Sequence, residues 1–249
     1  MTTSPAVSVI VRPPAAGARG RADPCLTCEA RPHSVCHAID ERSLERLASI
    51  AVVTHVAPGK TFIVEGDPAG EFCNITAGTA RIYKLLADGR RQITGFAQRG
   101  DFLGLAVSST YAFSAEAIDE VSLCRFSRRN LQALLADFPA MERCLLEVAS
   151  NELVAAQDQM LLLGRKTARE RLASFLVAQL QRVEAGGQSG DRILLVMTRT
   201  DIADYLGVTI ETVSRTFTRL KADRIIALPD IRTVVIADRA RLNEAAEAS

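Results

Sequence analysis

Hydrophobic positions change their spacing along the chain, and the changes predict three regions. Between Ala51 and Ser127, short apolar or alternating runs are interrupted by turn-forming Gly, Pro and Asp residues at intervals typical of strands. From Arg128 to Gly164 a helical pattern contains a single Pro and no internal Gly, which predicts a short helix followed by a long one. Beyond Gly164, amphipathic helical segments and short apolar runs predict a second, mixed domain.

We therefore expect an α+β protein with an N-terminal β-barrel of the jelly-roll type, a long helix and a C-terminal winged helix-turn-helix. A short helix that presents Leu44, Leu47 and Ile50 on one face precedes the strands. The expected parts are a flexible N-terminal arm (1–24), a cysteine-containing segment (25–39), the β-barrel sensor domain (40–139), a dimerisation helix (140–164) and the DNA-binding domain (165–249).

The long helix carries an apolar seam. Its spacing alternates between three and four residues, as in a coiled coil, and the seam residues are Leu146, Ala149, Leu153, Ala156, Met160 and Leu163. Such a seam favours a partner helix from a second copy of the chain, and hence a homodimer. The alternative is that the seam packs on the barrel of its own chain.

The order of capping residues, Gly and apolar positions in residues 198–220 is typical of a helix-turn-helix. Thr198 or Thr200 can cap a first helix, with Asp201 three residues after Thr198, and Gly207 stands where the chain must leave that helix in a left-handed conformation. Thr209 can cap the second helix. The inward positions are apolar in both helices: Ile202, Ala203, Leu206, Val213, Phe217 and Leu220.

The outward face of the second helix has the chemistry of base recognition. Arg215 can donate two hydrogen bonds to guanine, Glu211 can accept one from cytosine, and Ser214 can contact a thymine or a phosphate. The candidate DNA-binding residues are Glu211, Thr212, Ser214, Arg215, Thr218 and Arg219. A predicted hairpin around Pro229-Asp230 would form the wing. The competing interpretation, a helix pair with solvated charges, does not explain why cap, Gly and hairpin follow in this order.

Composition excludes some classes of protein but does not by itself indicate a function. The chain has 249 residues and a net charge of +1, so attraction to nucleic acid must come from a local patch. There is no run of about 18 apolar residues and no signal peptide, which favours a cytoplasmic protein without a membrane partner. No Gly-rich phosphate loop, HExxH or nucleophile elbow is present, so we do not expect an enzyme.

The candidate ligands for a metal or an iron–sulfur cluster are cysteines. Cys25, Cys28 and Cys36 cluster before the barrel, and Cys124 lies in an apolar strand at its end. In a reducing compartment such cysteines favour a metal, cluster or redox role over disulfides. Thiolates could hold an iron–sulfur cluster, could bind zinc together with His33 or His37, or could stay unliganded. The two other cysteines, Cys73 and Cys144, are expected to be small buried residues.

These features together resemble the cyclic AMP receptor/FNR superfamily of regulators over nearly the whole chain. The segment Leu-Gly-Val-Thr-Ile-Glu-Thr-Val-Ser-Arg, residues 206–215, is similar to the recognition segment of the FNR branch. Residues 157–163 and 168–176 are also similar to that branch, at the dimer helix and at the start of the DNA-binding domain. Seven residues separate Cys28 from Cys36, where the best-known members have five.

The resemblance implies an oxygen switch. Cys25, Cys28, Cys36 and Cys124 would bind a [4Fe-4S] cluster at low oxygen, the chain would dimerise, and Glu211, Ser214 and Arg215 would read TTGAT-N4-ATCAA-like sites in double-stranded DNA. Barrel-surface loops such as Tyr83 to Arg91 would touch RNA polymerase. The alternatives are a family regulator with another signal (zinc, thiol redox or a small molecule) and one that binds DNA constitutively.

Cyclic nucleotide is not expected as the effector. Relatives that bind it carry a Gly-Glu pair for the ribose and an Arg-Ser or Arg-Thr pair for the phosphate. This chain has Gly104-Leu105 and Phe113-Ser114 at the corresponding stretches. A phosphate without a cationic partner binds poorly. Cyclic AMP and, further behind, heme therefore remain weak alternatives as the signal.

Overall fold

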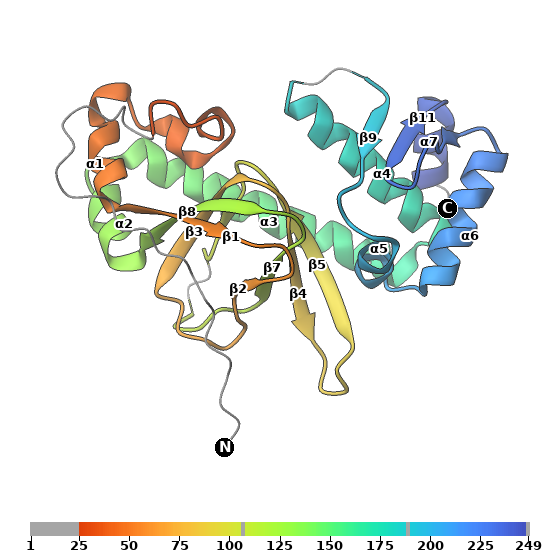
Figure 1. Ribbon diagram of the computed structural model, residues 1–249, viewed down its shortest axis with the longest axis horizontal. Helices are drawn as coiled ribbons and strands as arrows, with labels where there is room; N and C mark the ends of the chain where they lie inside the picture. The colour runs from red at the N-terminus through yellow and green to blue at the C-terminus, as the bar shows by residue number, and fades with distance from the viewer. Residues whose placement is uncertain (1–24, 106–107, 188–189, 248–249) are drawn as a thin grey trace. The chain divides into compact units, whose positions relative to one another are not determined.

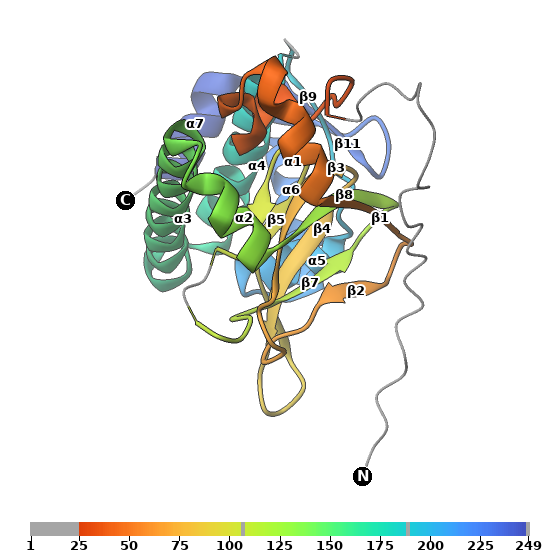
Figure 2. The ribbon, with the colours of Figure 1, turned by 90° about the vertical axis from the view of Figure 1, so that its left-hand side faces the viewer.

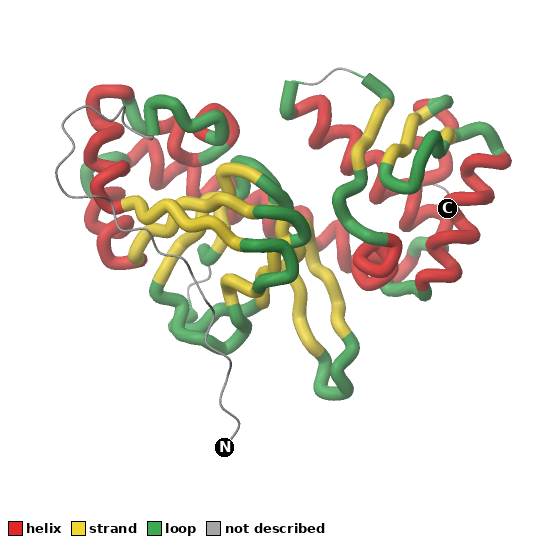
Figure 3. Tube along the Cα trace, in the orientation of Figure 1, coloured by secondary structure: helices red, strands yellow, loops and turns green. Residues whose placement is uncertain are grey.

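The computed structural model describes residues 25–105, 108–187 and 190–247. Within them, residues 25–84 and 94–153 form one compact unit, and residues 85–93 and 154–247 form a second. No helix in the described ranges is long and apolar enough to cross a membrane. Figure 3 shows that strands dominate residues 51–127, with helices before and after them.

The first unit is built on strands β1 to β8, which form two four-stranded sheets in the orders β1-β8-β3-β6 and β2-β7-β4-β5 (Figure 1). The strands are β1 (Ala51–Val56), β2 (Thr61–Ile63), β3 (Glu71–Ala77), β4 (Ala80–Leu85), β5 (Arg91–Ala97), β6 (Phe102–Leu103), β7 (Ser114–Ala117) and β8 (Val121–Ser127). The helical elements are η1 (Arg31–His33), η2 (Val35–Ala38), η3 (Glu41–Ser43), α1 (Leu44–Ile50), α2 (Arg128–Leu135) and α3 (Pro139–Arg165).

The two sheets share one apolar core. Val56, Ile75 and Leu123 of the first sheet pack with Ile63 and other residues of the second sheet in a single buried cluster. The predicted fold class, a jelly-roll domain followed by a long helix and a winged helix-turn-helix, is confirmed. The expected barrel is not closed, because its strands separate into two packed sheets.

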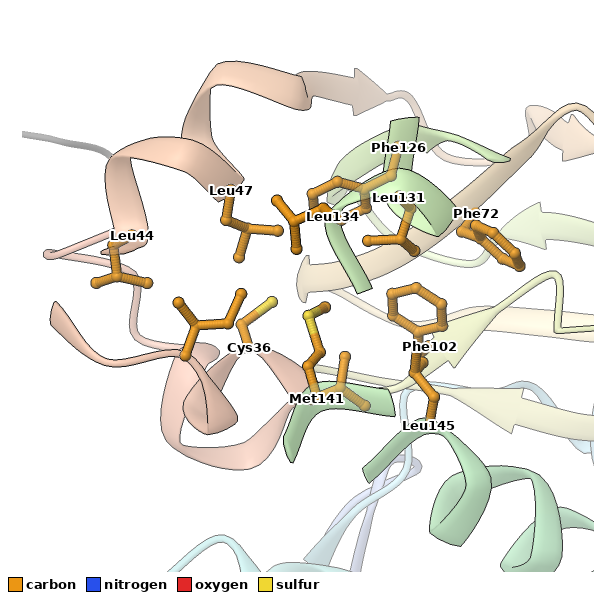
Figure 4. Packing of buried hydrophobic residues seen from close by; sticks show 12 residues of the cluster. Cys36, Leu44, Leu47, Phe72, Phe102, Phe126, Leu131, Leu134, Met141 and Leu145 are labelled. Carbon is orange, nitrogen blue, oxygen red and sulfur yellow. The ribbon is translucent and has the colours of Figure 1, made fainter. Parts of the chain in front are cut away.

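A second cluster covers the outer face of the β1-β8-β3-β6 sheet. Helices α1 and α2 lie side by side at the end where Ala51 of β1 pairs with Phe126 of β8 (Figure 2). The start of α3 and the cysteine segment complete this layer. Its fully buried members include Leu44, Leu47, Phe102, Phe126, Leu131 and Met141 (Figure 4).

The second unit contains the DNA-binding fold. Its elements are α4 (Ala168–Ala185), β9 (Arg192–Leu194), α5 (Arg199–Leu206), α6 (Ile210–Ala222), β10 (Ile226–Ala227), β11 (Thr233–Ile236) and α7 (Arg239–Glu247). Thr198 and Asp201 form the predicted capping box of α5, and Gly207 ends that helix with φ +63°. Thr209 caps α6, as predicted. The wing is a three-stranded sheet in the order β10-β11-β9, so β9 joins the hairpin that the sequence predicts.

Gly78 provides a test of the packing of the first unit. Its φ is +82°, and a Cβ there would lie 2.2 Å from the carbonyl oxygen of Glu120. At Gly89, with φ +85°, a Cβ would meet nothing within 4 Å. Gly89→Ala should therefore lower the free energy of unfolding only by the strain of placing Ala at a positive φ, about 1–2 kcal/mol. Gly78→Ala should lower the free energy of unfolding by roughly 1–3 kcal/mol more, because the backbone must move to make room for the new Cβ. Urea denaturation of both variants checks this, and equal unfolding midpoints would contradict it.

Candidate metal centre and nucleic-acid interface

The cysteine segment folds back on itself through two short 3-10 helices. Pro32 stands in the first turn of η1, and Ser34 then caps η2, its hydroxyl accepting a hydrogen bond from the backbone N–H of Cys36 at 3.3 Å. The cap turns the chain so that Cys36 is buried in the apolar layer, where its sulfur lies among the residues labelled in Figure 4. Cys25 packs against the same cluster, and so does Cys144, which is half-buried rather than buried as predicted.

Strand periodicity places Cys124 on the face that this segment covers. In β8, Leu123 points into the core between the sheets, so Cys124 and Phe126 point to the opposite face. In β3, Cys73 belongs to the inner core and Asn74 to the outer face, with its Cα opposite that of Cys124. Cys73 is therefore on the wrong face to join Cys124, and burial raises the pKa of its thiol to about 12.

Cys25, Cys36 and Cys124 pack in or against one apolar cluster, which places three of the four candidate ligands on the same face of the sheet. Burial raises the pKa of Cys124 to about 12, and the nearby thiols of Cys36, Cys25 and Cys28 add to the rise. Burial also raises the pKa of Cys36, against the opposing effect of its hydrogen bond with Ser34. Such thiols are neutral near pH 7 without a metal, and metal binding must displace their protons.

The two histidines do not complete a zinc site. Nδ1 of His37 lies 2.6 Å from the carbonyl oxygen of Ser34, and its Nε2 lies 4.0 Å from the sulfur of Cys144. Across the described residues, no three His, Cys, Asp or Glu side chains converge closely enough to ligate one metal ion. A four-iron cluster takes one thiolate on each iron and holds its ligand sulfurs farther apart than a single ion does. The candidate donors are thiols, which an iron–sulfur cluster takes as ligands, and thiols together with an imidazole also suit zinc.

The recognition helix α6 exposes the residues chosen from the sequence. Glu211, Ser214, Arg215, Thr218 and Arg219 are exposed, and Thr212 is half-buried. Val213, Phe217 and Leu220 are buried on the opposite side, as predicted. The structure thus presents one polar face of α6 to a ligand and anchors the other.

Two of these side chains are held at the N-terminus of α6. The backbone N–H of Glu211 and the side chain of Thr209 lower the pKa of the Glu211 carboxyl group, which therefore stays ionised and can only accept hydrogen bonds. Nη2 of Arg215 lies 3.4 Å from the hydroxyl of Thr212. The hydroxyl of Thr218 donates to the carbonyl of Ser214 at 3.0 Å, which favours a supporting role for Thr218.

Arg199 is a candidate DNA contact that the sequence analysis missed. It occupies the first position of α5, its guanidinium lies 3.3 Å from the centroid of the Phe217 ring, and burial lowers its pKa. Its Nη1 is buried and has no hydrogen-bond partner among the described residues. A helix N-terminus with an unsatisfied guanidinium is suited to a DNA phosphate. The signal in the sequence that could have identified this residue is an Arg directly after the Thr that caps the helix.

Comparisons with known proteins agree on one assignment. Residues 170–245 match the Crp-like helix-turn-helix domain, and residues 53–138 match the cyclic nucleotide-binding domain. The nitrogen fixation regulation protein FixK of Bradyrhizobium diazoefficiens is 43% identical over 82% of this chain and 86% of its own length. The chain belongs to the cyclic AMP receptor/FNR superfamily of transcription regulators.

Two further relatives support the same family. The transcriptional activator protein FnrL of Cereibacter sphaeroides is 37% identical over 89% of this chain and 91% of its own length. The structure of FixK2 from Bradyrhizobium japonicum covers 80% of this chain and 99% of its own, with 36% identity and a TM-score of 0.75. The protein is therefore a DNA-binding transcription regulator of the activator type, and not an enzyme.

Regulators of the CRP/FNR superfamily typically act as dimers, and helix α3 has a face available for a partner. Leu146, Leu153 and Met160 are 68%, 61% and 66% exposed. Ala149 and Ala156 are also exposed, and Leu163 is half-buried. Most of the predicted seam is thus left uncovered by its own chain, as a dimer helix requires.

The match to a cyclic nucleotide-binding domain describes the fold of the first unit. The resemblance places Leu105 and Phe113 where nucleotide-binding relatives have an acidic residue and an arginine. Ser114 is buried, and its hydroxyl accepts from the backbone N–H of Glu65 at 3.0 Å. The expectation that this family member binds no cyclic nucleotide remains a prediction.

Arg199 can be tested through the salt dependence of DNA binding. Arg199→Gln keeps part of the side-chain stem and removes the charge, so binding should weaken for all sequences and the slope of log K against log salt should fall by about 1 per contact. Arg239→Gln is the control, since Asp191 and Glu184 already pair with that arginine. An unchanged slope for Arg199→Gln would show that this residue does not contact phosphate.

Proposed function

We propose that this regulator responds to oxygen through a [4Fe-4S] cluster held by Cys25, Cys28, Cys36 and Cys124. The observation that supports it most is the packing of three of these cysteines: Cys25 and Cys36 of an N-terminal segment and Cys124 of strand β8, far apart in sequence, lie in or against one apolar cluster on the same sheet face. The FNR-branch resemblance of the chain supplies the identity of the group. When bound, the cluster supplies an oxygen-labile centre.

The chain's own residues link this site to the dimer helix. Cys36 packs in one buried cluster with Met141 and Leu145, which lie in the first turns of α3. Ligated thiolates would fix the cysteine segment on this cluster and favour one packing of the start of α3. The dimer-competent state would then be populated because the ligand binds that state better.

The paired recognition helices would read a pseudo-palindrome. In a symmetric dimer two α6 helices reach half-sites about one helical turn apart. Glu211, Ser214 and Arg215 would read the TTGAT-type half-site, as in the FNR branch, and Arg219 would contact the backbone. We propose that the bound dimer controls genes used at low oxygen and contacts RNA polymerase.

Iron analysis of cysteine variants tests the cluster. Protein purified without oxygen should contain roughly four irons and four sulfides per chain, with a visible absorption band that fades in air. Cys124→Ser should lose most of the iron, because a ligand is removed. Cys73→Ser is the control, since Cys73 lies on the inner face of the same sheet, and it should retain the cluster. Zinc, or no metal, in the native protein would contradict the proposal.

Binding to altered operators tests the recognition residues. Arg215→Ala should lose roughly 1–3 kcal/mol of discrimination for the guanine in each half-site and bind a substituted half-site as well as the original. Arg219→Ala, an equal change of charge on the same helix, should weaken binding to both sites alike. If Arg215→Ala retains the native preference, another residue reads that base.

A further inference from the structure

Asn74 is a buried amide with an incomplete set of hydrogen bonds. Its side chain is on the outer face of strand β3, and the residue is 2% exposed. Its Oδ1 has no hydrogen-bond partner among the described residues. Its Nδ2 lies 3.9 Å from the sulfur of Cys36, within reach of a hydrogen bond to sulfur.

Stability does not account for an amide at this position. Leaving a buried polar atom unpaired costs about 1–3 kcal/mol, and Phe72 and Phe126 make this face of the sheet apolar. Leu has the same branched shape as Asn, although it is larger, and it would leave no unpaired atom. A residue that is unfavourable for folding and is directed at a candidate ligand indicates a role at that ligand.

The amide is suited to a sulfur that carries charge. A neutral thiol is a weak acceptor, whereas an ionised acceptor makes hydrogen bonds that are roughly twice as strong. The Cα of Asn74 also pairs across the sheet with that of Cys124, so this amide stands beside two of the candidate ligands.

We propose that Asn74 is a positioning residue of the thiol site, and that its Nδ2–H donates a hydrogen bond to the Cys36 thiolate that ligates iron. This inference rests on the proposed cluster. Hydrogen bonds from outside the ligand set orient the ligands, and those to the sulfurs raise the reduction potential of an iron–sulfur cluster. Asn74 would therefore help to retain the cluster and set its potential.

The test compares the full-length protein with Asn74→Leu and Thr54→Val, all loaded with iron and sulfide without oxygen. Thr54 is the matched control: it is buried on strand β1, two strands from β3 in the same sheet, and its hydroxyl also has no partner in the described ranges. Three quantities are measured: the rate at which a chelator removes iron under nitrogen, the midpoint potential of the cluster, and the melting temperature of the cluster-free protein.

Asn74→Leu should lose iron roughly 10-fold faster than the native protein and have a lower midpoint potential. Its cluster-free form should melt at or above the native temperature, because an unpaired buried atom is removed. Thr54→Val should match the native protein in iron loss and potential. Should Asn74→Leu not fold, Asn74→Ser, which is too short to reach the sulfur, should show the same faster loss.

The possible failures are distinguishable. If the native protein loads the cluster and the Asn74 variant matches it in iron loss and potential, the role of Asn74 is overturned and the proposed function stands. If the cluster-free variant melts at a lower temperature than the native protein while the midpoint potential of its cluster is unchanged, the Asn74 amide has a purely structural role. That result also overturns the inference. A native protein that takes up no iron overturns the proposed function itself, and with it the inference.

Discussion

The burial of Cys36 in an apolar cluster is the constraint on which the sensor unit depends. That cluster draws on four parts of the chain that are distant in sequence: the cysteine segment with α1, the outer face of the β1-β8-β3-β6 sheet, α2 and the start of α3. A close-packed interior responds to changes of even one methylene. We therefore expect a change in the ligation or position of Cys36 to alter the packing of this cluster, which includes Met141 and Leu145 of α3.

In the proposed switch, this arrangement would link the thiol site to dimer assembly. The helix that borders the thiol site also carries the exposed seam residues Leu146 and Leu153. Leu145 is buried and Leu146 is exposed, so adjacent positions of one helix face the sensor core and the expected partner. A small change in the packing of the first turns of α3 would change how the seam residues are oriented toward a partner helix. Since a ligand shifts an equilibrium only by its differential affinity, the two arrangements must differ in how well they place the thiols.

The sequence predicted those features whose signals are local. Thr198, Gly207 and Thr209 mark the ends of α5 and α6 within a few residues, and the alternation in β8 is sufficient to assign Cys124 and Leu123 to opposite faces. Long-range features were not accessible. The addition of β9 to the wing and the partition of the strands into two sheets depend on pairing between distant segments. The roles of Asn74 and Arg199 emerge only from atoms left without partners, although a polar Asn inside the run Phe-Cys-Asn-Ile was a signal.

The most direct test of the oxygen switch follows the cluster and DNA binding in one sample. Protein prepared without oxygen is bound to a labelled operator, oxygen is added in small steps, and the visible absorption and the fraction of bound DNA are recorded together. The account predicts that both signals fall in parallel and that a rise in monomer accompanies them. DNA binding that persists after the absorption has gone would contradict it, and would leave a regulator of this family that responds to a different signal.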